Sequence, residues 1–155
     1  MPKALPEAEL LVVGVGSPLL AGLYIDGELA ERFEKEGKSS KVLPPILHDL
    51  RYRYRLKSIY YVRGPGSFMA IKVVYVMLKT FSIALDIPLY AADAFTLNGG
   101  APIKAVGRSR FVKRGDEIAV EPGEATAESS FTLPLRIDAV KWSRENEPLY
   151  ILPAV

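Results

Sequence analysis

Hydrophobic residues dominate the middle of the chain, and their spacing changes along it. Ile59–Val62 is a short β-branched and aromatic run, typical of a strand. Gly64-Pro65-Gly66 stops this run, because glycine reaches backbone angles closed to other residues and proline fixes its own φ. Ser67 is a favoured N-cap residue, and the apolar sequence after it predicts a helix from Ser67 to Leu85. Leu89–Ala92 then predicts another strand.

The predicted helix from Ser67 is apolar over most of its circumference. Its polar residues fall on one narrow stripe, at Lys72, Tyr75, Lys79, Ser82 and Asp86. A helix that covers one side of a sheet needs an apolar arc of only about a third of its circumference. Membrane insertion would hide the surplus, but Lys72 and Lys79 would each cost about 2.5–3.5 kcal/mol near a bilayer centre. We therefore exclude a membrane and expect the helix to pack on its own sheet and on a neighbour, either another helix of this chain or a second subunit.

The residues before this stretch predict three strands in a meander and then a helix. The strands are expected at Leu10–Val15, Leu19–Ile25 and Glu28–Lys35, with Asp26-Gly27 as a hairpin turn. Apolar positions with helical spacing predict a helix from Ser39 to Leu56. Three strands, a helix, a strand, a helix and a strand describe an α/β fold with a mixed sheet, the core of ribonuclease H-like and actin-like proteins.

Residues 93–155 carry weaker signals. Asp93 is placed to cap a short helical turn through Leu97. Phe131–Val140 alternates loosely, and Pro134 within it favours an edge strand. Short apolar runs predict further strands at Ile103–Val106, Glu117–Val120 and Pro148–Leu152. Two segments are expected to be loops, the basic run Arg108–Arg114 and the polar run Gly123–Ser130.

Composition narrows the class of protein. With 155 residues, 49% of them hydrophobic, the chain is expected to form one ordered globular domain. It contains no cysteine, which excludes disulfides, thiolate metal sites and cysteine nucleophiles. A net charge of +2 gives no overall attraction to nucleic acid. The first residues contain no apolar signal region, so we expect a cytoplasmic protein.

Candidate catalytic residues are few. His48 is the only histidine, and without a second histidine or a cysteine to complete a site we favour a surface or interface residue over a general base or metal ligand. Ser67 lacks the surroundings of a nucleophile elbow. The turn Gly64, Pro65, Gly66 and Ser67 is interpreted as structural rather than as a nucleotide contact, because no Gly-Lys-Ser/Thr ending follows it. We predict no catalytic residue and no metal site.

A basic run could contact nucleic acid. Arg51, Arg53, Arg55 and Lys57 alternate with aromatic or apolar residues, and such a pattern can bind phosphates and stack on bases. Cations also collect at the C-terminus of a helix, where they offset the carbonyl end of its dipole. We favour the second explanation, and a contact with tRNA stays open.

One segment carries a family resemblance. The sequence Tyr-Tyr-Val-Arg-Gly-Pro-Gly-Ser-Phe at residues 60–68, followed by a long helix and Ile87-Pro88-Leu89, resembles the signature of the TsaB (YeaZ) family. These bacterial proteins are needed for threonylcarbamoylation of the tRNA adenosine beside the anticodon. Family members continue with Thr-Gly and Leu/Val-Arg, where this chain has Met69 to Lys72. The resemblance is good over residues 10–92. It implies a single TsaB-like domain over residues 1–155, with 1–92 as the well-matched core and 93–155 as a reduced second lobe.

The resemblance also implies a role without catalysis. Relatives carry Asp-Thr-Ser or Asp-Thr-Ala where this chain has Val15-Gly16-Ser17. In ATP-hydrolysing members of the superfamily that aspartate helps to hold magnesium and phosphates, which a valine cannot do. We therefore expect an accessory subunit that binds no cofactor alone, with ATP and magnesium on its partner subunits.

The expected partner is a TsaD-type catalytic subunit, or a second copy of this chain. A TsaE-type ATPase is a further expected partner, and contact with tRNA would be indirect. In the family two helices dock the partner, so the expected interface consists of Leu43, Leu47, Leu50, Phe68, Met69, Val73, Val76 and Met77. Two other hypotheses stay open: a small actin-like ATP-binding phosphotransferase or peptidase-like hydrolase, and an RNA-binding module.

Overall fold

The computed structural model describes residues 4–105, 107–124 and 130–151. Within them lie eight strands, two α-helices and two short 3-10 helices. In chain order these are β1 (Glu7–Val13), β2 (Leu19–Ile25), β3 (Glu28–Lys35), α1 (Ser39–Arg53), β4 (Arg55–Val62), α2 (Phe68–Leu85), β5 (Leu89–Ala92), η1 (Ala94–Leu97), β6 (Ile103–Lys104), β7 (Ser109–Arg114), β8 (Glu117–Pro122) and η2 (Ile137–Ala139).

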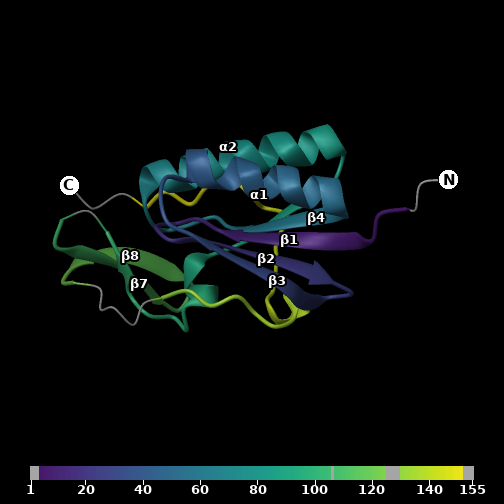
Figure 1. Ribbon diagram of the computed structural model, residues 1–155. Coiled ribbons are helices and arrows are strands. Elements are labelled where there is room, and N and C mark those ends of the chain that lie inside the picture. Colours follow the sequence, from purple (N-terminus) through teal and green to yellow (C-terminus); the bar gives the residue numbers. More distant parts are fainter. Residues whose placement is uncertain (1–3, 106, 125–129, 152–155) are drawn as a thin grey trace.

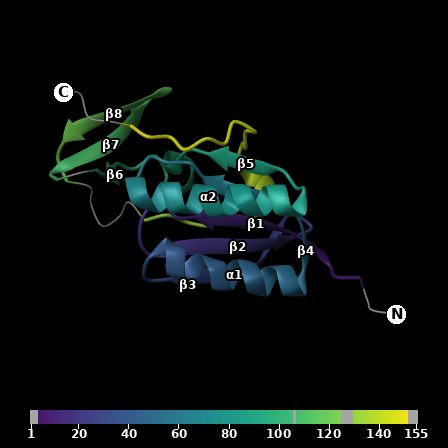
Figure 2. The same cartoon turned by 90° about the horizontal axis from the view of Figure 1, so that it is seen from above.

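A five-stranded mixed sheet forms the centre, with the strand order β3-β2-β1-β4-β5. Both α-helices cover one face of this sheet, and a smaller sheet of β6, β7 and β8 stands at one end of it (Figure 1). Seen from above, α1 and α2 lie side by side over the strands (Figure 2). This arrangement confirms the predicted α/β fold with a ribonuclease H-like or actin-like core.

Hairpins and crossovers explain the strand order. β1 pairs antiparallel with β2, and β2 pairs antiparallel with β3 through the predicted Asp26-Gly27 turn, where both residues have positive φ. β4 pairs parallel with β1 and with β5. Parallel neighbours require a crossover connection, which α1 and α2 supply. Two apolar cores result, one between the helices and the sheet and one on the opposite face.

The glycine turn before α2 is the point where three segments meet. The Ser67 N–H donates to the Val15 carbonyl at the end of β1 (2.7 Å), and the Leu149 N–H donates to the Arg63 carbonyl (2.7 Å). A Cβ on Gly66 would lie 2.5 Å from the Val15 carbonyl oxygen. A Cβ on Gly64 would lie 2.5 Å from the Leu149 carbonyl oxygen, and its φ of +127° is closed to most side chains. Both glycines are therefore required by close backbone packing.

Helix α1 ends earlier than predicted. It stops at Arg53, and Tyr54 already has extended backbone angles. Leu56 and Ser58 are buried while Arg55 and Lys57 are exposed, which is the period-two pattern of a strand. Arg55 and Leu56, the last two residues of the predicted helix, are thus the first two residues of β4.

The strand predictions are least accurate after Leu97. The basic run expected as a loop is strand β7, and its cations are neutralised across the β7–β8 hairpin and by η1: Arg110 and Arg114 pair with Glu121, and Lys113 pairs with Asp93. No strand is found in residues 130–151, although two were expected there. Val106, Leu152 and the loop residues 125–129 lie outside the described residues.

The C-terminal segment contacts both edges of the large sheet instead of adding a strand. At the β5 edge, Ala91 and Ser143 exchange two backbone hydrogen bonds of 2.8 and 2.9 Å. At the β3 edge, the Leu29 N–H donates to the Leu135 carbonyl (2.9 Å). The buried Tyr24 hydroxyl also donates to the Pro134 carbonyl (2.7 Å), and burial raises the pKa of Tyr24 well above its ordinary value. The path of this segment is set by long-range hydrogen bonds to the sheet, and not by the alternating pattern that suggested a strand.

The glycine turn generates a stability prediction. Gly64→Ala is expected to destabilise the protein by about 3 kcal/mol or more, because it combines an unfavourable φ with a backbone clash. Gly99→Ala is the matched control, since Gly99 also has a positive φ (+70°) but has nothing within 4 Å of its Cβ position. That variant is expected to lose only about 1–2 kcal/mol. Urea unfolding of the two variants measures both values, and equal losses would contradict the proposed close packing.

Candidate partner-binding surface and cleft

The outer face of α2 is apolar and exposed. Ile71, Val74 and Leu78 are buried on the opposite side of the helix and fix it to the sheet. The exposed large apolar residues of α2 are Phe68 (51% exposed), Met69 (64%), Val76 (53%) and Ile83 (69%). We call these four residues the α2 face. Clusters of exposed apolar side chains on one element are characteristic of interaction sites.

The predicted polar stripe of α2 does not form its outer face. Ser82 is buried, and its hydroxyl donates to the Lys79 carbonyl (2.8 Å). Tyr75 is half-buried and lies 6.0 Å from the Tyr61 ring. The stripe therefore runs along the flank that faces β5 and the C-terminal segment. Ser82 is absorbed by the fold, whereas Lys72 and Asp86 are exposed beside the apolar arc that faces outward.

Three of the predicted interface residues are not available to a partner. Leu43, Leu47 and Leu50 are buried against the sheet within the chain's own core. Helical periodicity identified the apolar face of α1 correctly, but that face points inward and the polar face points outward. The outer surface of α1 instead carries Tyr52, which is 81% exposed, and His48. His48 is exposed, as the favoured interpretation expected.

The remaining predicted interface residues lie on or beside the α2 face. Phe68, Met69 and Val76 belong to it, while Val73 and Met77 are half-buried next to it. The sequence did not identify Tyr150 as a neighbour of this surface. Its ring lies 4.3 Å from the Phe68 ring and is partly exposed. No local pattern could have shown this contact, because it joins residues far apart in the chain.

Length and composition alone would allow α2 to cross a membrane, and 22% of its residues are buried within the chain. The core helix of a folded domain passes the same test of length and hydropathy. Here α2 packs on the sheet as the crossover between β4 and β5.

Most of the basic run is already paired with acidic residues. Arg51 is the member of the run without an ion pair in the described part of the chain. The pairs are Arg53 with Glu31 (2.8 Å) and Asp49 (2.7 Å), Arg55 with Glu7, and Lys57 with Glu9 (4.0 Å). The Arg53 guanidinium, as hydrogen-bond donor, lowers the pKa of Glu31, and the Tyr54 hydroxyl adds to this effect. Arg53 and Tyr54 thus join the end of α1 to β3, and Arg55 and Lys57 join β4 to β1, so the paired cations have a structural role.

A polar cluster around Glu9 resembles a catalytic group, but each of its side chains already has a hydrogen-bond partner. Glu9 accepts hydrogen bonds from the Ser58 hydroxyl (2.6 Å) and the Tyr60 hydroxyl (2.5 Å). Burial, followed by the hydrogen bond to Glu9, raises the pKa of Tyr60 to about 12. The Tyr60 ring is in turn packed between Tyr90 and Trp142. Each polar group of the cluster is held by another, as expected for buried structural polar residues.

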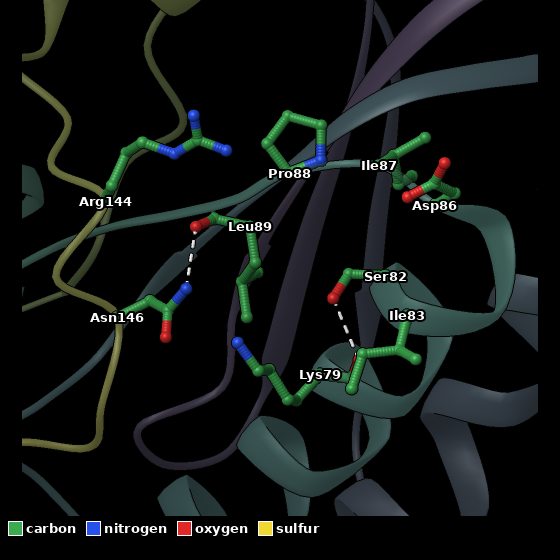
Figure 3. Close-up of a pocket in the computed structure, with 9 residues that line it drawn as sticks. All are labelled: Lys79, Ser82, Ile83, Asp86, Ile87, Pro88, Leu89, Arg144 and Asn146. Carbon is green, nitrogen blue, oxygen red and sulfur yellow. Dashed lines mark hydrogen bonds between the residues drawn. The ribbon is translucent and has the colours of Figure 1, made fainter.

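A recess of about 420 Å³ lies between the second half of α2 and the C-terminal segment (Figure 3). The Asn146 amide donates to the Leu89 carbonyl (2.9 Å) and so holds the C-terminal segment against β5. Lys79 and Arg144 extend along the recess from opposite sides. Lys79 belongs to α2 and Arg144 to the C-terminal segment. The recess is a seam between two packed segments.

A larger cleft of about 940 Å³ opens at the end of β1, between the large sheet and the small one. The family resemblance places the aspartate that ATP-hydrolysing members of the superfamily use for magnesium and phosphates at the position of Val15, which lines this cleft, and the residues here do not fit a nucleotide. Val15 is buried in apolar surroundings and offers no ligand to magnesium. The Ser67 N–H is used by the Val15 carbonyl, and Gly66 packs directly on Val15. The predicted turn residues therefore occupy the expected place but act as a structural joint. The described residues include no group of three or more metal-ligating side chains.

Comparison with known proteins agrees with this architecture. No family model matches the sequence, and no curated protein is significantly similar to it. YeaZ from Pseudomonas aeruginosa, 17% identical, superposes with a TM-score of 0.60 over 77% of this chain and 66% of its own. A crystal structure described as an uncharacterized protein with similarity to peptidase YEAZ from Pseudomonas aeruginosa is 16% identical, with a TM-score of 0.62 over 96% of this chain and 85% of its own.

The fold is thus that of the ribonuclease H-like and actin-like proteins. Among solved structures it is similar to YeaZ in particular, and the chain spans about two thirds of that protein's length. The similarity of fold agrees with the resemblance carried by residues 60–68.

The ion pairs of α1 generate a pH prediction. The pKa of Glu31 is lowered in the folded protein, so its stabilising effect is complete above its ordinary pKa of 4.5 and is lost as the pH falls through the lowered value. The melting temperature of Glu31→Gln is therefore expected to lie below that of the wild type at neutral pH, with a difference that shrinks in acid. Glu117→Gln, at an exposed position on β8, is the control and should show no such narrowing. A gap for Glu31→Gln that stays constant in acid would refute this role for the ion pair.

Proposed function

We propose that this protein is a TsaB-like accessory subunit in threonylcarbamoyl modification of the tRNA adenosine beside the anticodon. In this role it docks a TsaD-type catalytic subunit through the α2 face and the neighbouring surface of α1. The observation that carries the proposal is the α2 face itself, because four large apolar side chains are exposed on a helix whose inner side is already packed. The fold shared with YeaZ and the signature at residues 60–68 support the same role.

The mechanism is conformational rather than chemical. Burial of the α2 face would contribute binding energy of roughly 25 cal/mol for each Å² of apolar surface removed from water. A partner that is bound in one conformation is stabilised in that conformation by mass action. The accessory subunit thereby holds its catalytic partner in an active form. ATP and magnesium, and any TsaE-type ATPase, belong to the partners, and tRNA contacts this chain only indirectly.

The two alternative functions have less support. A phosphotransferase would need an acidic ligand near Val15, and a peptidase-like hydrolase would need a base beside Ser67, whereas His48 lies on the exposed side of α1. An RNA-binding module would need free cations, and three of the four cations of the basic run are paired.

The docking surface generates the main prediction. Val76→Asp is expected to keep its fold, because Val76 is 53% exposed, but to place an unpaired charge in the interface. Affinity for the TsaD-type protein of the same organism should fall by at least about 30-fold, equivalent to about 2 kcal/mol. Leu135→Asp is the matched control, since Leu135 is equally apolar, is 79% exposed and lies in the segment beside β3. Co-elution on a sizing column and calorimetry measure the effect.

The outcomes separate the possible assemblies. Loss of binding by Val76→Asp but not by Leu135→Asp supports the α2 face as the docking surface. If Val76→Asp binds the TsaD-type protein as tightly as the wild type does, the surface is wrong. If the wild type does not bind that protein but forms a homodimer that Val76→Asp dissociates, the surface is right and the partner is a second copy.

A separate measurement tests the absence of nucleotide chemistry. Calorimetric titration of the isolated chain with ATP and magnesium is expected to show no saturable heat, because neither Val15 nor the turn offers a ligand to the metal or the phosphates. Saturable binding, accompanied by phosphate release, would instead favour the phosphotransferase hypothesis.

A further inference from the structure

The cleft between the two sheets has the lining of a site for an apolar ligand. Its size of about 940 Å³ lies in the range of pockets that enclose drug-sized molecules. Six of the residues that line it are apolar and buried. They come from the end of β1 and the residues after it, the start of β2, the start of α2 and the small sheet: Val13, Val15, Leu20, Ile71, Ile103 and Phe111. Most of the remaining lining is apolar as well, apart from serines such as Ser17 and Ser109.

The described lining of the cleft includes one positively charged and one negatively charged side chain. Among the described residues that line it, Lys104 on β6 and Glu34 on β3 are the charged ones, and both are exposed. Neither forms an ion pair within the described chain. One ammonium group can pair with one acidic group of a ligand, while the Glu34 carboxylate repels further negative charge. A polyphosphate is therefore disfavoured by charge as well as by lining.

We propose that this cleft binds a small, mostly apolar molecule that carries a single acidic group, such as an aromatic or aliphatic carboxylate. The apolar body lies over Val15, Ile71 and Phe111, and burial of its surface provides most of the affinity. The acidic group pairs with Lys104 at the mouth and orients the molecule.

The cleft shares Phe68 and Met69 with the α2 face, whereas Val76 and Ile83 lie outside its lining. Val76→Asp therefore tests docking and Ser109→Trp tests the cleft, so either proposal can fail without the other.

Two fluorescent probes of similar shape test the proposal. Anilinonaphthalene sulfonate is apolar with one acidic group, and phenylnaphthylamine is its uncharged counterpart. Both are expected to bind the folded wild-type protein with saturable fluorescence. Ser109→Trp, at a half-buried position in the lining of the cleft, is expected to weaken both probes by about tenfold or more, because the indole fills space.

A charge variant tests the role of Lys104. Lys104→Met is expected to weaken anilinonaphthalene sulfonate by about two- to fivefold, the range of an exposed ion pair, and to leave phenylnaphthylamine unchanged. Lys141→Met removes an exposed cation outside the cleft and is expected to change neither probe. Unchanged melting temperatures show that the variants are folded.

Several results would overturn the proposal. Probe binding that is unaffected by Ser109→Trp but lost in Val76→Asp would place the probes on the α2 face. If Lys104→Met weakens the binding of both probes equally, Lys104 does not recognise an acidic group and that part of the proposal is wrong. Displacement of both probes by ATP and magnesium would show that the cleft is a nucleotide site after all.

Discussion

The hydrogen bond from the Ser67 N–H to the Val15 carbonyl ties the start of α2 to the end of β1, and much of the molecule depends on it. It can form only because Gly66 lets the two backbones approach to a distance that a Cβ would prevent. The Arg63 carbonyl, beside the same turn, accepts a hydrogen bond from the Leu149 N–H, so the C-terminal segment is fixed to the same point. Local backbone packing here sets the position of a helix, a strand end and a distant part of the chain together.

Once α2 is fixed at this point, its rotation about its own axis decides which residues face outward. Ile71, Val74 and Leu78 are anchored in the core, and Val76 and Ile83 are consequently left in contact with water. This exposure is not a defect of packing, because the core beneath the helix is complete without these residues. The turn also brings Val15 under Gly66, so the apolar cleft and the apolar helix face both follow from one joint.

Sequence patterns predicted the first part of the fold well and the last part poorly. β2, β3 and β5 have the predicted bounds, and α2 begins one residue after the predicted start, because alternation and glycine punctuation act locally. The division between exposed and buried faces of the helices was harder. Leu43 and Val76 are both apolar residues on helices, and only the packing of the sheet shows that one is buried and the other exposed. Contacts such as Phe68 with Tyr150 depend on the tertiary fold and leave no local signal.

The way in which the C-terminal segment meets the outer strands has a consequence for assembly. Unpaired strand edges are general templates on which other chains can add strands and form fibres. Here Ser143 occupies the β5 side and Leu135 begins to cover the β3 side. The rest of β3 carries the charged residues Glu31, Arg32, Glu34 and Lys35, which discourage strand addition. These contacts and charges disfavour growth of the large sheet by strand addition. The α2 face is thus presented to water by a chain whose large sheet disfavours the addition of further strands.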